Sequence, residues 1–139
     1  MSDPVAERLT PHTTFSAFSI ANRVRCESPD GFNHALNSWD TSDWFLAVLG
    51  ELGEAANVAK KLNRVRDGIP GNKETPDELR DKLRKEIGDA FVYLDLLAQA
   101  HGFSICDAAI EVFNAKSREI GYPLELKATG APALQGTER

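Results

Sequence analysis

Apolar residues recur every three to four positions along most of this chain, the spacing that places them on one face of an α-helix. No segment alternates apolar and polar residues as a strand does. Start and stop signals divide the periodic stretches into separate helices. We expect helices over residues 15–27, about 42–66, about 76–100 and 105–120, with a short helical turn within 32–37. The pattern predicts an all-α fold, a helical bundle of about four to five helices.

The clearest helix boundary precedes the third stretch. Thr75-Pro-Asp-Glu78 is a capping box, in which Thr75 caps the helix, Pro76 takes its first position and Glu78 reaches back. The acidic residues at 40 and 43 are cap candidates for the second stretch. The turn-rich segment 67–74 that joins these two stretches is short, so the two helices should run antiparallel.

The composition is that of an ordinary globular domain: 139 residues, 42% hydrophobic and 27% charged, with a net charge of −5. We expect one domain over residues 1–127 and a flexible tail over 128–139, with the first dozen residues also mobile. The acidic balance argues against nucleic-acid binding, and no apolar run approaches a membrane span. The two cysteines lack metal-ligand spacing and indicate reduced thiols in a cytoplasmic protein, although a single disulfide stays open.

Two tetrads of the same design carry the candidate chemistry: Glu51-Leu-Gly-Glu54 and Glu86-Ile-Gly-Asp89. Residues three apart share a helix face, so each tetrad aims two carboxylates in one direction. One such tetrad alone is usually a solvated face. Here the helical rows through the acids are apolar, which predicts that the acids lie in the core-facing stripes; these rows contain Trp44, Ala47, Val58, Leu79, Tyr93 and Leu96.

Four clustered carboxylates in a poorly solvated site need a cation, because like charges raise one another's pKa. All-oxygen ligation favours Mg²⁺, with Mn²⁺ possible, and two or more ions per site. The predicted ligands are Glu51, Glu54, Glu86 and Asp89. A glycine inside a helix costs about 1 kcal/mol relative to alanine, so we interpret Gly53 and Gly88 as allowing close helix approach or leaving room beside the metals.

The antiparallel arrangement gives this cluster two different ends. Lys61 follows Glu54 by seven residues and Lys82 precedes Asp89 by seven, so both lie at the loop end, about 10 Å away at 1.5 Å per residue. Trp44 and Tyr93 lie at the opposite end, and Lys73 is available on the loop. A nucleoside triphosphate has this polarity. Solubilising lysines and a core tryptophan would also explain these residues.

At these residues the chain resembles the MazG-like branch of the all-α nucleoside triphosphate pyrophosphatases, whose hallmark is Glu-x-x-Glu on one helix and Glu-x-x-Asp on the next. The resemblance covers most of the chain, including Ser38-Trp39, residues 50–61 and 86–97, and 113–118 with Gly121-Tyr-Pro123. It implies an all-helical protomer whose four-helix metal core is completed by dimerisation, as a homodimer or homotetramer. It also implies metal-dependent cleavage of an NTP or dNTP to a monophosphate and pyrophosphate.

The chain departs from the family pattern at two places. Gly50 stands where many members carry a further Glu before the first tetrad, so that carboxylate's role cannot be carried over. In the terminal basic motif Asn114 and Lys116 match, but Arg118 falls closer to Lys116 than is usual. Phosphate contacts from the last helix are therefore the weakest part of the resemblance.

For the reaction, we expect Glu51 or Glu54 to accept a proton from the attacking water. The candidate phosphate contacts are Lys61, Lys73, Lys82 and Lys116. The candidate base and sugar contacts are Trp39, Trp44, Tyr93, Asn114 and Asn33, and a purine, dGTP or GTP, is the expected base. Asp40 and Asp43 could also read a base edge, although helix capping explains them. We interpret Asp95, in an apolar run, as a buried ion-pair partner.

Two other classes of helical protein are alternatives to a pyrophosphatase. A carboxylate-bridged di-iron protein needs Glu-x-x-His on two helices, and none of the three histidines has such a partner. A non-catalytic helical module that binds nucleotide and metal, for regulation or dimerisation, fits the same residues and stays open as an alternative.

Overall fold

The computed structural model describes residues 13–127, and within them the fold is all-α. The elements are α2 (Phe15–Glu27), the 3-10 helix η1 (Leu36–Ser38), α3 (Thr41–Arg66), α4 (Pro76–Ala100) and α5 (Ile105–Ile120). The described residues contain no strand. The predicted fold class is confirmed, and each α-helix begins and ends within about one residue of its predicted bounds, as local capping signals allow. The expectations for residues 1–12 and 128–139 lie outside the described residues.

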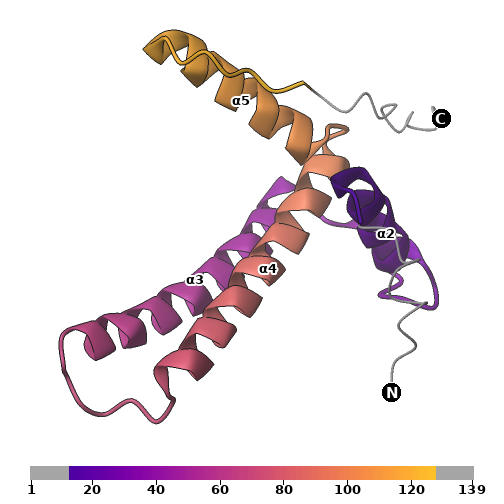
Figure 1. Cartoon of the computed structure of the whole chain (residues 1–139). Helices are drawn as coiled ribbons and strands as arrows, with labels where there is room; N and C mark the ends of the chain where they lie inside the picture. The colour runs from indigo at the N-terminus through magenta and orange to yellow at the C-terminus, as the bar shows by residue number, and fades with distance from the viewer. Residues whose placement is uncertain (1–12, 128–139) are drawn as a thin grey trace, which may run out of the picture.

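A long antiparallel hairpin of α3 and α4 is the main body of the molecule (Figure 1). The predicted capping box at Thr75 is present before α4, and Asp40, predicted as a cap candidate, caps α3 and forms a capping box with Asp43. Gly121 ends α5 in a left-handed conformation with φ of 70°, which a residue without Cβ adopts at no steric cost. The prediction that the two tetrad helices are antiparallel neighbours is confirmed.

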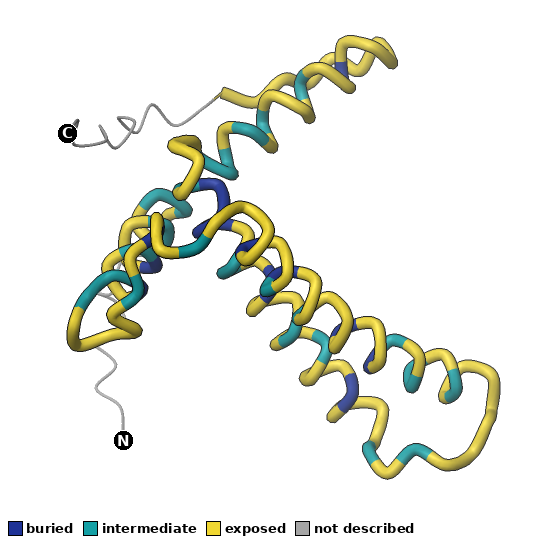
Figure 2. The backbone as a smooth tube through the Cα atoms, turned by 180° about the vertical axis from the view of Figure 1, so that it is seen from behind, coloured by how far each residue is buried: buried dark blue, intermediate teal, exposed yellow. Residues whose placement is uncertain are grey.

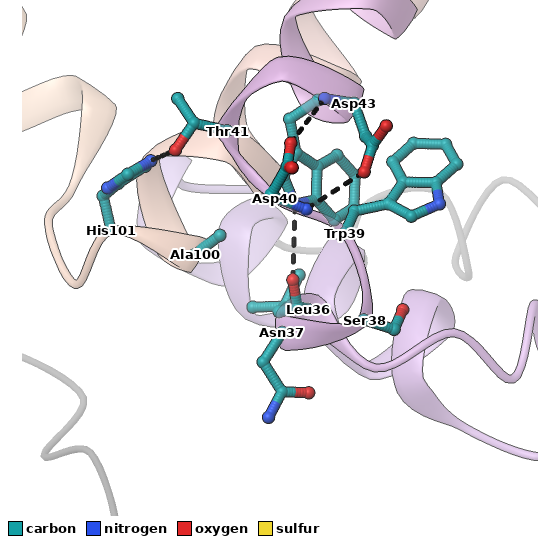
Figure 3. A pocket seen from close by; sticks show the side chains of 10 residues that line it. Leu36, Asn37, Ser38, Trp39, Asp40, Thr41, Asp43, Ala100 and His101 are labelled. Carbon is teal, nitrogen blue, oxygen red and sulfur yellow. Dashed lines mark hydrogen bonds between the residues drawn. The ribbon is translucent and has the colours of Figure 1, made fainter.

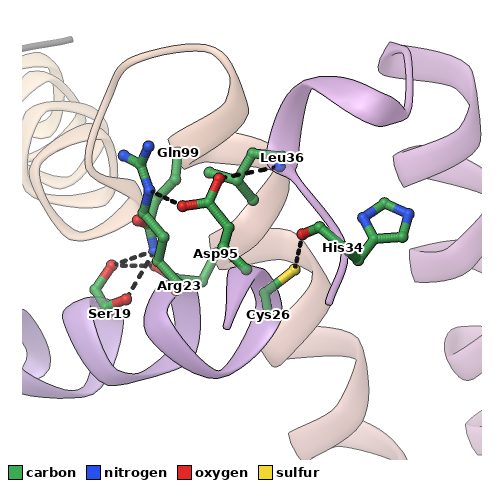
Figure 4. A network of polar contacts seen from close by, with 8 residues as sticks. Ser19, Arg23, Cys26, His34, Leu36, Asp95 and Gln99 are labelled. Atoms are coloured by element: carbon green, nitrogen blue, oxygen red, sulfur yellow. Dashed lines mark hydrogen bonds and ion pairs between the residues drawn. The ribbon is translucent and has the colours of Figure 1, made fainter. Parts of the chain in front are cut away.

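The core lies where α2, η1 and the start of α3 meet the end of α4. Its buried residues are Cys26, Leu36, Trp44, Leu96 and Leu97, with Trp39 and Tyr93 packed against them. Both cysteines are free, which agrees with reduced thiols. The Cys26 thiol donates to the His34 carbonyl at 3.2 Å (Figure 4).

Asp95 was predicted to be a buried ion-pair partner, and this is wrong. Its side chain is fully buried on α4, and the groups that donate to it are neutral (Figure 4). Ser19 Oγ donates to Oδ1 at 2.6 Å, while Asn22 Nδ2 and Gln99 Nε2 each donate to Oδ2 at 2.9 Å. Polar donors from α2 therefore take the place of a cation, and the contact fastens α2 to α4.

Much of the hairpin and of α5 is exposed, as the yellow stretches of the tube in Figure 2 show. Large apolar side chains are among the exposed residues, including Leu46 at 67% and Leu49 at 58% on α3 and Val112 at 70% on α5. No helix in the described part of the chain is long and apolar enough to cross a membrane.

Candidate functional site

Three of the four predicted acids converge between the two long helices. Glu51 and Glu54 on α3 and Glu86 on α4 each offer a carboxylate oxygen, and these three oxygens lie within 4.8 Å of one another. We call these residues the acid triad. The fourth acid, Asp89, is exposed on α4 and lies outside this group, although its charge acts on Glu51.

The sequence builds the acid triad through helical spacing and small buried neighbours. Glu51 and Glu54 are one turn apart on α3, and the antiparallel hairpin places Glu86 opposite them. Ala55 and Ala90, beside the two tetrads, are buried, and small side chains between helices let their axes approach.

The four acids are not equally buried, which corrects part of the prediction. Glu51 and Glu86 are half-buried, whereas Glu54 and Asp89 are exposed. The reason is that only two helices flank this part of the described chain, so the acid stripe lies at the edge of their contact rather than inside a closed core.

Electrostatic repulsion is concentrated at Glu51. Burial raises the pKa of its carboxyl first, and the negative charges of Asp89, Glu54 and Glu86 raise this pKa further. A hydrogen bond with the Glu86 carboxyl acts in the same direction because it needs a proton. Three close carboxylates without a cation among them are an all-oxygen donor set, which fits a hard divalent ion such as Mg²⁺ or Mn²⁺.

Gly53 and Gly88 do not mediate the approach of the two helices. A Cβ built at either position would meet no atom within 4 Å, apart from its own neighbours. The interpretation of close helix approach is therefore wrong for the described chain, because neither glycine faces the partner helix. Room beside a metal stays a prediction.

At the loop end of the hairpin the two predicted lysines meet. Lys61 on α3 and Lys82 on α4 both donate to the same oxygen, Glu74 Oε1, at 2.7 Å and 2.9 Å. These hydrogen bonds, first that of Lys61 and then that of Lys82, lower the pKa of Glu74 to about 2. We call this arrangement the Glu74 bridge. Lys73 is exposed on the loop, and Lys116 pairs with Glu119 on α5 at 2.8 Å.

At the opposite end, a pocket of about 510 Å³ opens beside the N-terminus of α3 (Figure 3). Trp39 and Trp44 lie in its wall with ring centroids 4.8 Å apart. Trp44 is only 2% exposed, and its Nε1 donates to the Leu36 carbonyl at 3.3 Å, so its ring belongs to the core. The carboxylates of Asp40 and Asp43 serve the capping box, as the capping interpretation expected.

The remaining predicted base contacts lie apart from this pocket wall. Tyr93 is half-buried against the core. Asn33 is exposed in the turn before η1 with a φ of 50°. Asn114 on α5 accepts from the Leu126 backbone N–H at 2.7 Å and donates to its carbonyl at 2.8 Å. The Asn114 amide thus holds the segment after α5 against that helix.

No protein-family model matches this chain, and no solved structure matches it. The chain is similar to the Gene 37 protein of Mycobacterium phage L5. The two are 33% identical over 73 residues, which is 52% of this chain and 52% of that protein. The chain thus spans about half the length of this curated relative, whose name describes no activity.

Sequence reasoning missed two features of the site. Glu74 precedes the helix cap, where helical periodicity assigns no direction to a side chain, so nothing marked it as the partner of both lysines. His101 follows α4 and lies in the pocket wall, where its Nε2 is 3.0 Å from Thr41 Oγ1. The position of His101 just after the end of a predicted helix could have indicated this. In an antiparallel hairpin the C-terminal end of α4 lies beside the N-terminal end of α3, where the pocket opens.

Proposed function

We propose that this protein is a metal-dependent nucleoside triphosphate pyrophosphohydrolase, which cleaves an NTP or dNTP to a monophosphate and pyrophosphate. The observation that supports this most directly is the acid triad, three carboxylate oxygens from two facing helices within 4.8 Å of one another. The family resemblance of the paired tetrads supports the same reaction. The expected substrate is a purine nucleotide, dGTP or GTP, and the expected location is the cytoplasm.

The acid triad together with Asp89 would hold Mg²⁺ or Mn²⁺, two or more ions per site. When bound, such ions neutralise phosphate charge and lower the pKa of a coordinated water. The protein's own contribution is a carboxylate near the attacking water, and Glu51 in the acid triad is one candidate for this role. Glu54, which is exposed and nearer to solvent, is the other candidate.

A homodimer or homotetramer is part of this proposal. Contiguous exposed apolar surface is typical of association sites. The exposed face of α3 carries such side chains close to the first tetrad, at Phe45, Leu46, Leu49 and Leu52. A second hairpin packed on this face would bury them in a four-helix bundle.

The alternative is a non-catalytic nucleotide- and metal-binding helical module that acts in regulation or dimerisation. The observation that favours it is that several side chains predicted to contact substrate have structural partners. Trp44 is in the core, Asn114 clamps Leu126, and Lys116 pairs with Glu119.

The deciding experiment is to incubate the full chain with each of the eight common NTPs and dNTPs and Mg²⁺, and to quantify monophosphate, pyrophosphate and orthophosphate. We expect monophosphate and pyrophosphate in equal amounts, with a purine nucleotide turned over fastest. Orthophosphate as the product would exclude the proposed cleavage position. Nucleotide binding without turnover would favour the non-catalytic module.

A further inference from the structure

The Glu74 bridge joins two cationic helix faces through one oxygen atom. Lys61 Nζ and Lys82 Nζ, from α3 and α4, both lie within 2.9 Å of Glu74 Oε1. One carboxylate oxygen accepts from two positively charged groups, and the negative charge of Glu78 also acts on Lys82. Two ammonium groups that converge on a single acceptor oxygen present the geometry in which lysines bind phosphate.

We propose that the Lys61–Lys82 pair is a binding site for a phosphate or polyphosphate anion, and that Glu74 is a built-in competitor that occupies it until the anion displaces the carboxylate.

Access to this site is open. The side chains of Lys61 and Lys82 are 41% and 51% exposed, while that of Glu74 is 17% exposed. Ion pairs between partly exposed side chains contribute little net stability in water. A ligand with more negative charge than one carboxylate can therefore compete for the two ammonium groups.

The hairpin loop does not depend on the bridge for its shape. Asn72 Nδ2 donates to the Lys61 carbonyl at 2.8 Å, and the Ile69 N–H donates to the Arg64 carbonyl at 2.9 Å. Thr75 and Glu78 exchange the two hydrogen bonds of the capping box. The carboxyl group of Glu74 can leave the lysines while these contacts hold the loop and the start of α4.

The position of the pair suits a ligand that also reaches the acid triad. Lys82 precedes Glu86 by four residues, so it lies on the same face of α4 and about 6 Å along the axis. Lys61 follows Glu54 by seven residues, again on nearly the same face. The idea that this site contacts the phosphate chain of a nucleotide rests on the proposed function. The idea that the site binds an anion does not depend on that function.

Charge states at neutral pH agree with this arrangement. The pKa of Glu74 is about 2, so its carboxyl is ionised, and the hydrogen bond to Glu74 raises the pKa of Lys82 above its usual value. The bridge is therefore fully charged under physiological conditions, and a ligand must compete with an ionised carboxylate.

Asp81 on α4 is a matched control for Glu74. It also accepts from two cations, Arg84 at 2.6 Å and Lys85 at 2.8 Å, and its pKa is also lowered to about 2. All three residues of that group belong to α4, so no cleft between elements is involved. Asp81→Asn removes the same unit of charge as Glu74→Gln but opens no site between helices.

The test is the affinity of the full chain for inorganic pyrophosphate, measured by isothermal titration calorimetry in EDTA so that neither metal nor turnover contributes. Glu74→Gln should tighten binding about fivefold, because one competing charge is removed. Asp81→Asn should leave the affinity within about twofold of the unchanged chain. The double variant Lys61→Gln/Lys82→Gln should lose pyrophosphate binding.

Two results would overturn the proposal. One is an unchanged or weakened affinity in Glu74→Gln, and the other is an equal gain in Glu74→Gln and Asp81→Asn, which would reflect net charge alone. If Glu74→Gln unfolds, the lysine double variant decides, since retained binding there excludes the site. If the chain hydrolyses no nucleotide, the proposed function fails but this binding test is unaffected. If the chain hydrolyses nucleotides and Glu74→Gln does not change pyrophosphate binding, only the anion-site proposal fails.

Discussion

Glu51 and Glu74 are two glutamates of one helical hairpin with opposite electrostatic surroundings. Glu51 lies among carboxylates on α3, and its pKa is raised by burial and by the charges of Asp89, Glu54 and Glu86. Glu74, at the loop end, accepts from Lys61 and Lys82, and its pKa falls to about 2. On α3, helical spacing places the acids Glu51 and Glu54 together and places Lys61, which binds Glu74, about two turns further along. The acid triad would therefore gain from a bound cation, whereas two lysines already offset the charge of Glu74.

The largest effect should follow from removing the charge of Glu51. Glu51→Gln should lower the proposed pyrophosphate-releasing activity by about 10²–10⁴-fold, the range for loss of a general base. Far-ultraviolet circular dichroism should be unchanged because Gln keeps the size and helix propensity of Glu. The measurement is the rate of pyrophosphate release, with Asp81→Asn as the control at full rate. Activity retained in Glu51→Gln would remove this residue from the mechanism.

A third carboxylate, that of Asp95, differs from both glutamates because its hydrogen-bond partners are neutral. Asp95→Ala should destabilise the chain by about 3 kcal/mol, since Ser19, Asn22 and Gln99 would each lose a buried acceptor. Urea unfolding measures this free energy. Asp107→Ala is the control, because Asp107 is an exposed aspartate in the first turn of α5 and lies outside the core. A loss below about 1 kcal/mol would show that α2 is held mainly by apolar contacts.

Divalent metal should act on the acid triad and not on the Glu74 bridge. At 100 times its dissociation constant, Mg²⁺ should raise the free energy of unfolding by about 2.7 kcal/mol, because it binds only the folded arrangement. Differential scanning calorimetry with and without EDTA checks this. Glu86→Gln should reduce the stabilisation, whereas Glu74→Gln should preserve it. Equal stabilisation of both variants would place the metal elsewhere.

The sequence predicts some of these features and not others. Helix bounds and capping boxes were predicted because their signals are local, as at Thr75. The convergence of three of the four predicted acids could be predicted because three-residue spacing and a short loop together determine which helix faces meet, whereas Asp89 lies outside the group. The partners of Asp95 could not be predicted, since Ser19 and Asn22 lie on α2, more than 70 positions away. The unequal burial of the four acids depends on how many helices cover them, which spacing does not reveal.

The two glutamates should also give opposite pH dependences of stability. A lowered folded pKa means that the Glu74 bridge stabilises the fold above pH 4.5 and that this contribution is lost as pH falls from 4.5 toward 2. A raised folded pKa means that Glu51 contributes below pH 4.5 and that its contribution is lost as pH rises through its folded pKa.

Unfolding curves in urea from pH 2 to pH 7 check both signs without metal. Glu74→Gln should flatten the acid-side loss of stability, and Glu51→Gln should flatten the loss that begins above pH 4.5. Parallel curves for the unchanged chain and for both variants would show that neither carboxyl has a folded pKa different from its unfolded value.

The smallest effect should follow from substituting the glycines inside the tetrads. These substitutions distinguish an effect on folding stability from an effect on the acid site. Gly53→Ala should stabilise the chain by about 0.5–1 kcal/mol, because a Cβ there meets nothing within 4 Å and alanine is the better helix former. Gly50→Ala is the matched control, since it lies on the same helix with equally open space but outside the tetrad. Urea unfolding and pyrophosphate release are measured on both variants. If both variants gain stability and only Gly53→Ala loses activity, Gly53 is needed to leave space beside the acids. If Gly53→Ala loses stability where Gly50→Ala gains it, a second copy of the chain packs against that position.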